Sequence, residues 1–172
     1  KPDWERDRKW LQKQIRYLKG AKTAEHRAKR RLDVLKAKRS YIDNFAYVER
    51  WDTMRTALDQ MFDREWLTAE EQRLLPQGPV FDLAGYAYRD YAEAAYHQAD
   101  AKGYAWAMGR RFNVRWQELT AEDANSAEWH SFSKYVASST RKLISLGGKK
   151  ETIASFHGFY KKVRDKAGKY DA

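Results

Sequence analysis

Hydrophobic residues recur along this chain at the three- and four-residue intervals of amphipathic helices. Near the start of the chain, one face carries Trp4, Leu11, Ile15 and Leu18, and Gly20 follows. Near the end, two such stripes flank Gly147 and Gly148; they comprise Trp129, Phe132, Val136 and Leu143, then Ile153, Phe156, Tyr160, Val163 and Ala167. We therefore predict that residues 126–167 form an antiparallel helical hairpin.

Helix start and stop signals divide the rest of the chain. Thr23, Thr68 and Thr120 each precede an Ala-Glu pair, and a threonine hydroxyl followed by an acid suits the first turn of a helix. The segment 76–79, Pro-Gln-Gly-Pro, is the strongest breaker. We expect helical structure over 81–103, where small residues share a face. Over 104–119 we expect a short helix with an irregular segment, because Asn-Val at 113–114 has poor helix propensity.

These patterns define the fold class. Strand signals are weak, since no stretch alternates apolar and polar residues for long and no Asn-Gly or Asp-Gly turn occurs. A chain of 172 residues suits one ordinary domain. The prediction is an all-α protein of antiparallel helical hairpins, as an irregular bundle or a short α-solenoid, with residues 1–40 as a basic helical arm and residues 41–172 as a helical body.

Charge separates the arm from the body. Residues 1–40 contain 15 Lys and Arg against 5 Asp and Glu, so they hold the whole net charge of +10. We expect this arm to bind a polyanion or an acidic protein surface. The candidate binding residues are the cations of its second half: Arg27, Lys29, Arg30, Arg31, Lys36, Lys38 and Arg39.

Two partners are compatible with the arm. RNA would fit because Trp4, Trp10 and Tyr17 alternate with basic residues, as base stacking beside phosphate contact requires. A protein partner would fit because one apolar seam runs along the same segment and suits packing on a helix. This predicted docking seam consists of Trp4, Leu11, Ile15 and Leu18.

Small and apolar residues in the middle of the chain follow a repeat-like spacing. Ala92, Ala99 and Gly103 keep intervals of seven and four, as do Ala137, Ile144 and Gly148, while Met54 and Met61 keep the first interval alone. Residues 41–148 thereby resemble degenerate pentatricopeptide repeats, which are helical hairpins of about 35 residues. The resemblance implies a short curved helical stack that offers a surface to a peptide, a partner subunit or RNA.

Catalytic and cofactor signatures are scarce. The chain has no Cys, no glycine-rich phosphate loop and no His-Glu-x-x-His motif. Two Ser-x-x-Lys matches, at Ser131 and Ser139, lie in one Ser- and Lys-rich segment and indicate chance rather than a nucleophile. The four histidines lie far apart in sequence. We expect no enzyme activity, metal, cofactor or small-molecule substrate, although an unrecognised site would reopen the enzyme class.

No apolar run approaches the roughly 18 residues of a membrane span, so none is expected. The leading hypothesis is a non-catalytic accessory subunit of a large assembly, inside the cell and in the mitochondrial matrix, such as ATP synthase, another respiratory complex or the mitochondrial ribosome. Its partners would be other protein subunits. The alternative is an RNA-binding helical-repeat module.

Overall fold

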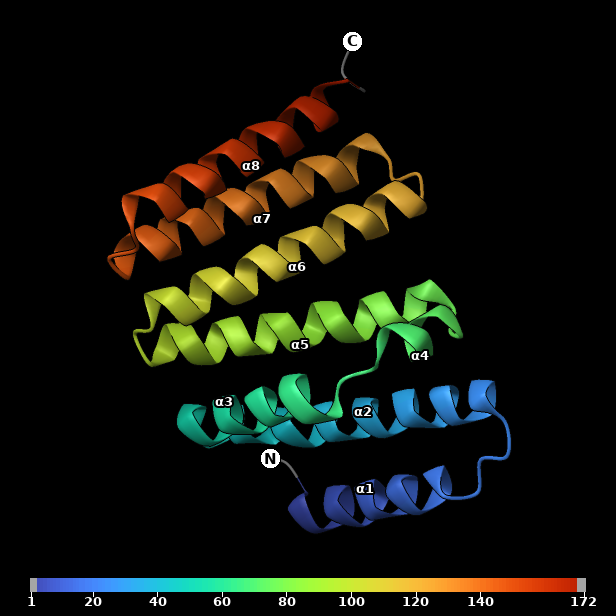
Figure 1. Ribbon diagram of the computed structural model, residues 1–172. Helices are drawn as coiled ribbons and strands as arrows, with labels where there is room; N and C mark the ends of the chain where they lie inside the picture. The colour runs from blue at the N-terminus through green and yellow to red at the C-terminus, as the bar shows by residue number, and fades with distance from the viewer. Residues whose placement is uncertain (1–2, 170–172) are drawn as a thin grey trace. The chain divides into compact units, whose positions relative to one another are not determined.

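The computed structural model describes residues 3–169 and confirms the all-α prediction (Figure 1). Within that range there are eight α-helices, one π-helical turn and no strand. The chain divides into two compact units, residues 1–83 and 84–172, and the division falls within one helix, α5 (Gln77–His97). The predicted boundary between arm and body, at residue 40, falls elsewhere. It lies inside the continuous helix α2 (Ala24–Tyr47), and both ends of α2 belong to the first unit.

The first unit is built on an antiparallel pair, α1 (Trp4–Leu18) and α2. Contacts at both ends define the direction: Trp4 meets Phe45 near the end of α2, with ring centroids 5.4 Å apart, while the Arg30 guanidinium near the start of α2 lies 3.8 Å from the centroid of the Tyr17 ring. Asn44, buried in α2, donates a 2.8 Å hydrogen bond to Asp7 of α1. The predicted arm therefore folds back on itself as a hairpin.

Two further helices and a π-helical turn complete this unit. The helix α3 (Trp51–Gln60) packs on α2 and runs into the π-helical turn η1 (Met61–Glu65); the short helix α4 (Ala69–Arg73) also contacts α2. Met54, Leu58 and Met61 are almost fully buried. The predicted helix starts at Thr23 and Thr68 are confirmed, since both side chains cap the following helix, and Thr68 forms a reciprocal capping box with Glu71.

In the second unit the later part of α5 is followed by α6 (Ala101–Ala121), α7 (Ser126–Ser145) and α8 (Lys150–Gly168). The predicted hairpin over 126–167 is confirmed as α7 and α8, joined at Gly147, which has a φ of 75°. That left-handed conformation suits glycine. The hairpin buries most of its two apolar stripes, and Ile153 and Tyr160 are half-buried. The Phe112 ring of α6 stacks on Phe159 of α8 with centroids 5.4 Å apart.

Three local predictions are wrong in this unit. Residues 81–103 are not helical throughout, because α5 ends at His97 and the separate helix α6 begins at Ala101, capped by Asp100. The helix α6 is continuous across Asn113, because Asn113 is exposed and costs little there, whereas Tyr104, Met108 and Phe112 are buried one turn apart on a face that drives packing. Thr120 does not begin a helix; its hydroxyl donates to the carbonyl of Trp116 within α6. The next helix starts instead at Asn125, whose side chain accepts a hydrogen bond from the Glu128 N–H.

Candidate binding surfaces

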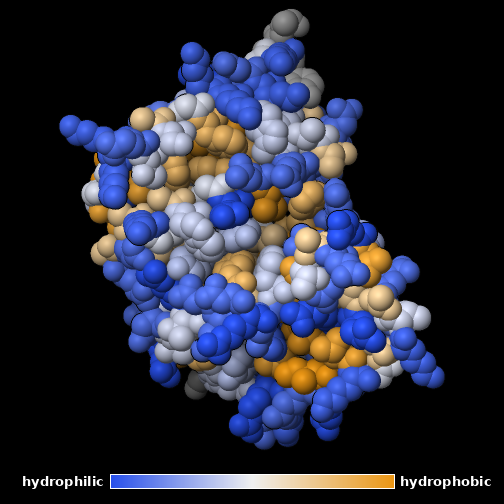
Figure 2. Space-filling model, in the orientation of Figure 1, coloured by the Kyte–Doolittle hydropathy of each residue, from blue (hydrophilic) through white to orange (hydrophobic). Residues whose placement is uncertain are grey.

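The predicted docking seam on α1 is largely occupied by α2 of the same chain. Trp4 packs against Tyr41 and Phe45, and Leu11 and Leu18 are half-buried. Ile15 is 38% exposed. Figure 2 shows an orange, hydrophobic area in the lower part of the view, where α1 lies against α2. The seam thus contributes mainly to the internal hairpin, and only part of it faces outward.

Four of the seven predicted binding cations are engaged inside the first unit. Arg31 donates to the backbone carbonyls of Glu65 and Trp66 at 2.8 and 3.2 Å and pairs with the Glu71 carboxylate. Lys38 pairs with the Glu65 carboxylate at 2.6 Å. The other two are Arg30, which donates to the Tyr17 carbonyl, and Arg39, which pairs with Asp43. These cations hold α2 to its neighbours or to itself rather than to a partner.

The remaining three cations, Arg27, Lys29 and Lys36, are exposed, and no ion pair engages them among residues 3–169. Lys29 and Lys36 are seven residues apart and share a face of α2. Arg27 projects from a different side, because nine residues from Arg27 to Lys36 turn the helix by about half a revolution. The seven residues therefore do not form one basic surface. The sequence could not predict this, because it does not show which backbone carbonyls accept hydrogen bonds from these cations.

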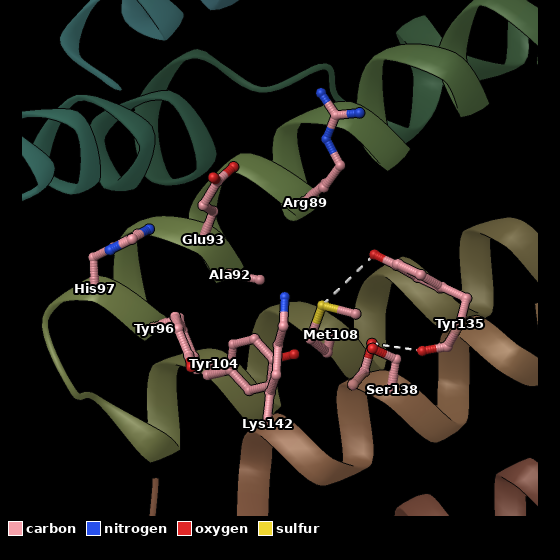
Figure 3. Close-up of a pocket in the computed structure, with 11 residues that line it drawn as sticks. Arg89, Ala92, Glu93, Tyr96, His97, Tyr104, Met108, Tyr135, Ser138 and Lys142 are labelled. Carbon is pink, nitrogen blue, oxygen red and sulfur yellow. Dashed lines mark hydrogen bonds between the residues drawn. The ribbon is translucent and has the colours of Figure 1, made fainter. Parts of the chain in front are cut away.

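A pocket of about 290 Å³ lies between α5, α6 and α7 in the second unit (Figure 3). One helical face of α5 supplies one wall and one face of α7 the other, and Tyr104 and Met108 of α6 lie at the base. Hydrogen bonds fix the α7 wall: the Tyr135 hydroxyl contacts the Met108 sulfur at 3.9 Å, and the Ser139 hydroxyl donates to the Tyr135 carbonyl at 2.8 Å. The polar lining comprises Arg89, Glu93, Tyr96, His97, Tyr104, Tyr135, Ser138, Ser139 and Lys142.

Burial raises the pKa values of two tyrosines that line this pocket, Tyr104 and Tyr135. Burial raises the pKa of Tyr104 to about 12, against a partly offsetting hydrogen bond with Ser139. Burial also raises the pKa of Tyr135, and the nearby Arg111 guanidinium opposes that effect. On the walls, Arg89 and Lys142 offer positive charge to a ligand, and Glu93 offers negative charge.

The Ser-x-x-Lys match at Ser139 falls in this pocket without forming a nucleophile. Its hydroxyl donates to a backbone carbonyl, and the Lys142 ammonium lies 5.4 Å from the centroid of the Tyr96 ring. Sequence reasoning missed the pocket itself. The available signal was polar and aromatic residues at helical spacing on both walls, such as Arg89, Glu93 and His97, but their convergence depends on how three helices pack.

Residues 3–169 contain no group of three His, Asp or Glu side chains placed to hold a metal ion. Within the same range, none of the helices has the length and apolar character that crossing a bilayer requires.

Neither a known protein family, nor a curated protein sequence, nor a solved structure matches this chain.

Proposed function

We propose that this chain is a non-catalytic accessory subunit that binds other proteins through the surfaces of its helices. The observation that carries the proposal is the exposure of large apolar side chains in both units. Trp10 is 44% exposed, Tyr47 71%, Trp106 41% and Ile144 49%. Large aromatic residues are enriched at protein interfaces because they bury much area for little conformational entropy.

The proposed setting is a large mitochondrial assembly, such as ATP synthase, another respiratory complex or the mitochondrial ribosome, with the chain in the matrix. Support comes from the helical hairpins, the excess of cations in residues 1–40 and the repeat-like spacing of small residues in 41–148. The mitochondrial setting is proposed from this similarity of architecture. Binding to other proteins is proposed from the exposed apolar side chains.

Purification from the native source tests the proposal. The tagged chain should sediment with a large assembly under mild salt, with fixed stoichiometry to its partners, and crosslinks should connect its helices to them. Sedimentation as a free chain of 20.3 kDa, with no stoichiometric partner, would remove the accessory-subunit role.

RNA binding is the second proposal, favoured by the exposed cations Lys29 and Lys36, which share a face of α2. Replacing these two by Gln should weaken binding of a single-stranded RNA and reduce its dependence on salt, because fewer counterions are released. Replacing Arg31 and Lys38 by Gln removes the same charge from cations that bind inside the unit; this control should leave the salt dependence unchanged. Absence of salt-sensitive RNA binding by the unmodified chain would exclude this role.

A further inference from the structure

A second hollow surface runs along α6 and α8 in the second unit. One hollow of about 500 Å³ lies between the start of α6 and the turn that joins α7 to α8, and an adjoining hollow of about 380 Å³ lies between the middle of α6 and α8. Ala105, Trp106 and Thr152 line both. The two hollows therefore form one groove, which we name the α6–α8 groove.

The groove is open because small residues line its α6 side. Ala101, Ala105 and Gly109 are one helical turn apart, and a Cβ atom placed on Gly109 would meet no other atom within 4 Å. Larger apolar groups surround this space: Leu143 closes one end, and Phe156 and Phe159 line the other. Apolar side chains of a partner would find both room and apolar walls here.

Every charged side chain that lines the groove is positive. These are Lys102 and Arg110 of α6 and Lys149, which precedes α8, and all three are exposed. Asp100 lies beside the groove in sequence, but its carboxylate accepts a hydrogen bond from the Gly103 N–H at the start of α6. Glu151, on the first turn of α8, does not line either hollow. The groove thus combines apolar hollows with cations along its rim and lacks a carboxylate in its lining.

We propose that the α6–α8 groove binds an acidic amphipathic helix of a partner protein, an inference that rests on the proposed role as an accessory subunit. The apolar face of such a helix would fill the hollows beside Ala105 and Gly109, and its Asp and Glu residues would meet Lys102, Arg110 and Lys149. Charge complementarity selects this partner over a basic segment or a second copy of a chain whose net charge is +10. The apolar hollows favour a peptide over RNA, which needs stacking platforms and a denser row of cations.

The test uses the full chain and a phage-displayed library of random peptides. We expect the selected peptides to be acidic, with Leu, Phe or Trp at helical spacing. Replacing Lys102 and Lys149 by Glu should weaken these peptides by at least about tenfold, since rim charges steer and select partners. Lys134→Glu with Lys161→Glu, two exposed lysines outside the groove, is the control with the same change in charge and should change affinity less than twofold.

A second variant tests the apolar half of the proposal. Gly109→Leu fills open space and improves helix propensity, so it should preserve folding while weakening the selected peptides by about tenfold or more. Unchanged binding by Lys102→Glu with Lys149→Glu, or by Gly109→Leu, would overturn the proposal. So would a library that yields no binders, dimerisation of the chain through this face, or groove-dependent binding of oligouridylate in place of peptide.

The proposed function and this inference can fail separately. If the chain sediments with an assembly but the Lys102 and Lys149 variant assembles as well as the unmodified chain, the groove is not the docking site and the accessory role stands. If acidic peptides bind the groove but no assembly contains the chain, the accessory role fails instead.

Discussion

Arg31 should stabilise the first unit, although its sequence context marks it as one of a row of binding cations. Its guanidinium donates to the carbonyls of Glu65 and Trp66 and pairs with Glu71 at 3.2 Å, so it joins α2 to the end of η1 and to α4. We predict that Arg31→Met destabilises the protein, whereas Arg27→Met, one turn away on the same helix and exposed, does not.

The magnitude follows from the contacts. Hydrogen bonds to a charged group contribute about 1.5–3 kcal/mol when well shielded. The Arg31 side chain is 31% exposed and that of Glu71 is 21% exposed, so water can replace part of what is lost and the ion pair itself is screened. We expect Arg31→Met to lower the free energy of unfolding by about 1–2 kcal/mol and Arg27→Met to change it by less than about 0.5 kcal/mol.

Urea unfolding followed by far-UV circular dichroism measures both variants. The double-mutant cycle of Arg31→Met with Glu71→Gln separates the ion pair from the two carbonyl contacts. If Arg31→Met and Arg27→Met have equal effects, the contacts of Arg31 contribute nothing and its assignment to the internal packing of the unit is refuted.

Three further predictions concern stability. Burial raises the pKa of Tyr104 to about 12 from 10.0, so at pH 10 to 12 the folded state keeps a proton that the unfolded chain releases. The free energy of unfolding should therefore fall as pH rises from about 10 to 12, by about 2 kcal/mol more in the unmodified protein than in Tyr104→Phe. Equal pH profiles of the two proteins in urea titrations would contradict this. Thr68→Ala should cost about 1 kcal/mol by removing the capping box, while Thr120→Ala, within α6, should cost less than about 0.5 kcal/mol; equal changes in denaturation midpoint would refute the cap. Leu143→Ala should cost about 2–5 kcal/mol because the side chain is fully buried, against less than about 0.5 kcal/mol for Ile144→Ala, its 49% exposed neighbour; similar losses in thermal unfolding would show that the burial pattern of α7 is wrong.

The hairpin of α7 and α8 was predictable because its apolar stripes are long and the turn contains Gly147, so local pattern and tertiary packing agree. The continuity of α6 was missed because Asn113 signals a break in isolation. Tertiary burial of Tyr104, Met108 and Phe112 outweighs the few tenths of a kcal/mol that such a residue costs.

The binding surfaces were less accessible to sequence reasoning. The excess charge of residues 1–40 is real, yet Arg31 and Lys38 bind the segment around Glu65, some thirty residues away in sequence. The α6–α8 groove depends on which residues of α6 remain small and which cations flank them once α8 is in place, and neither condition shows as a local pattern.

Crosslinking mass spectrometry on the chain purified in its native assembly tests the central claim most directly. The account predicts that the chain sediments with large protein partners and that Lys102 and Lys149 crosslink to one of them next to an acidic helical segment. It is contradicted if the chain sediments alone as a 20.3 kDa protein and forms no crosslinks to another protein.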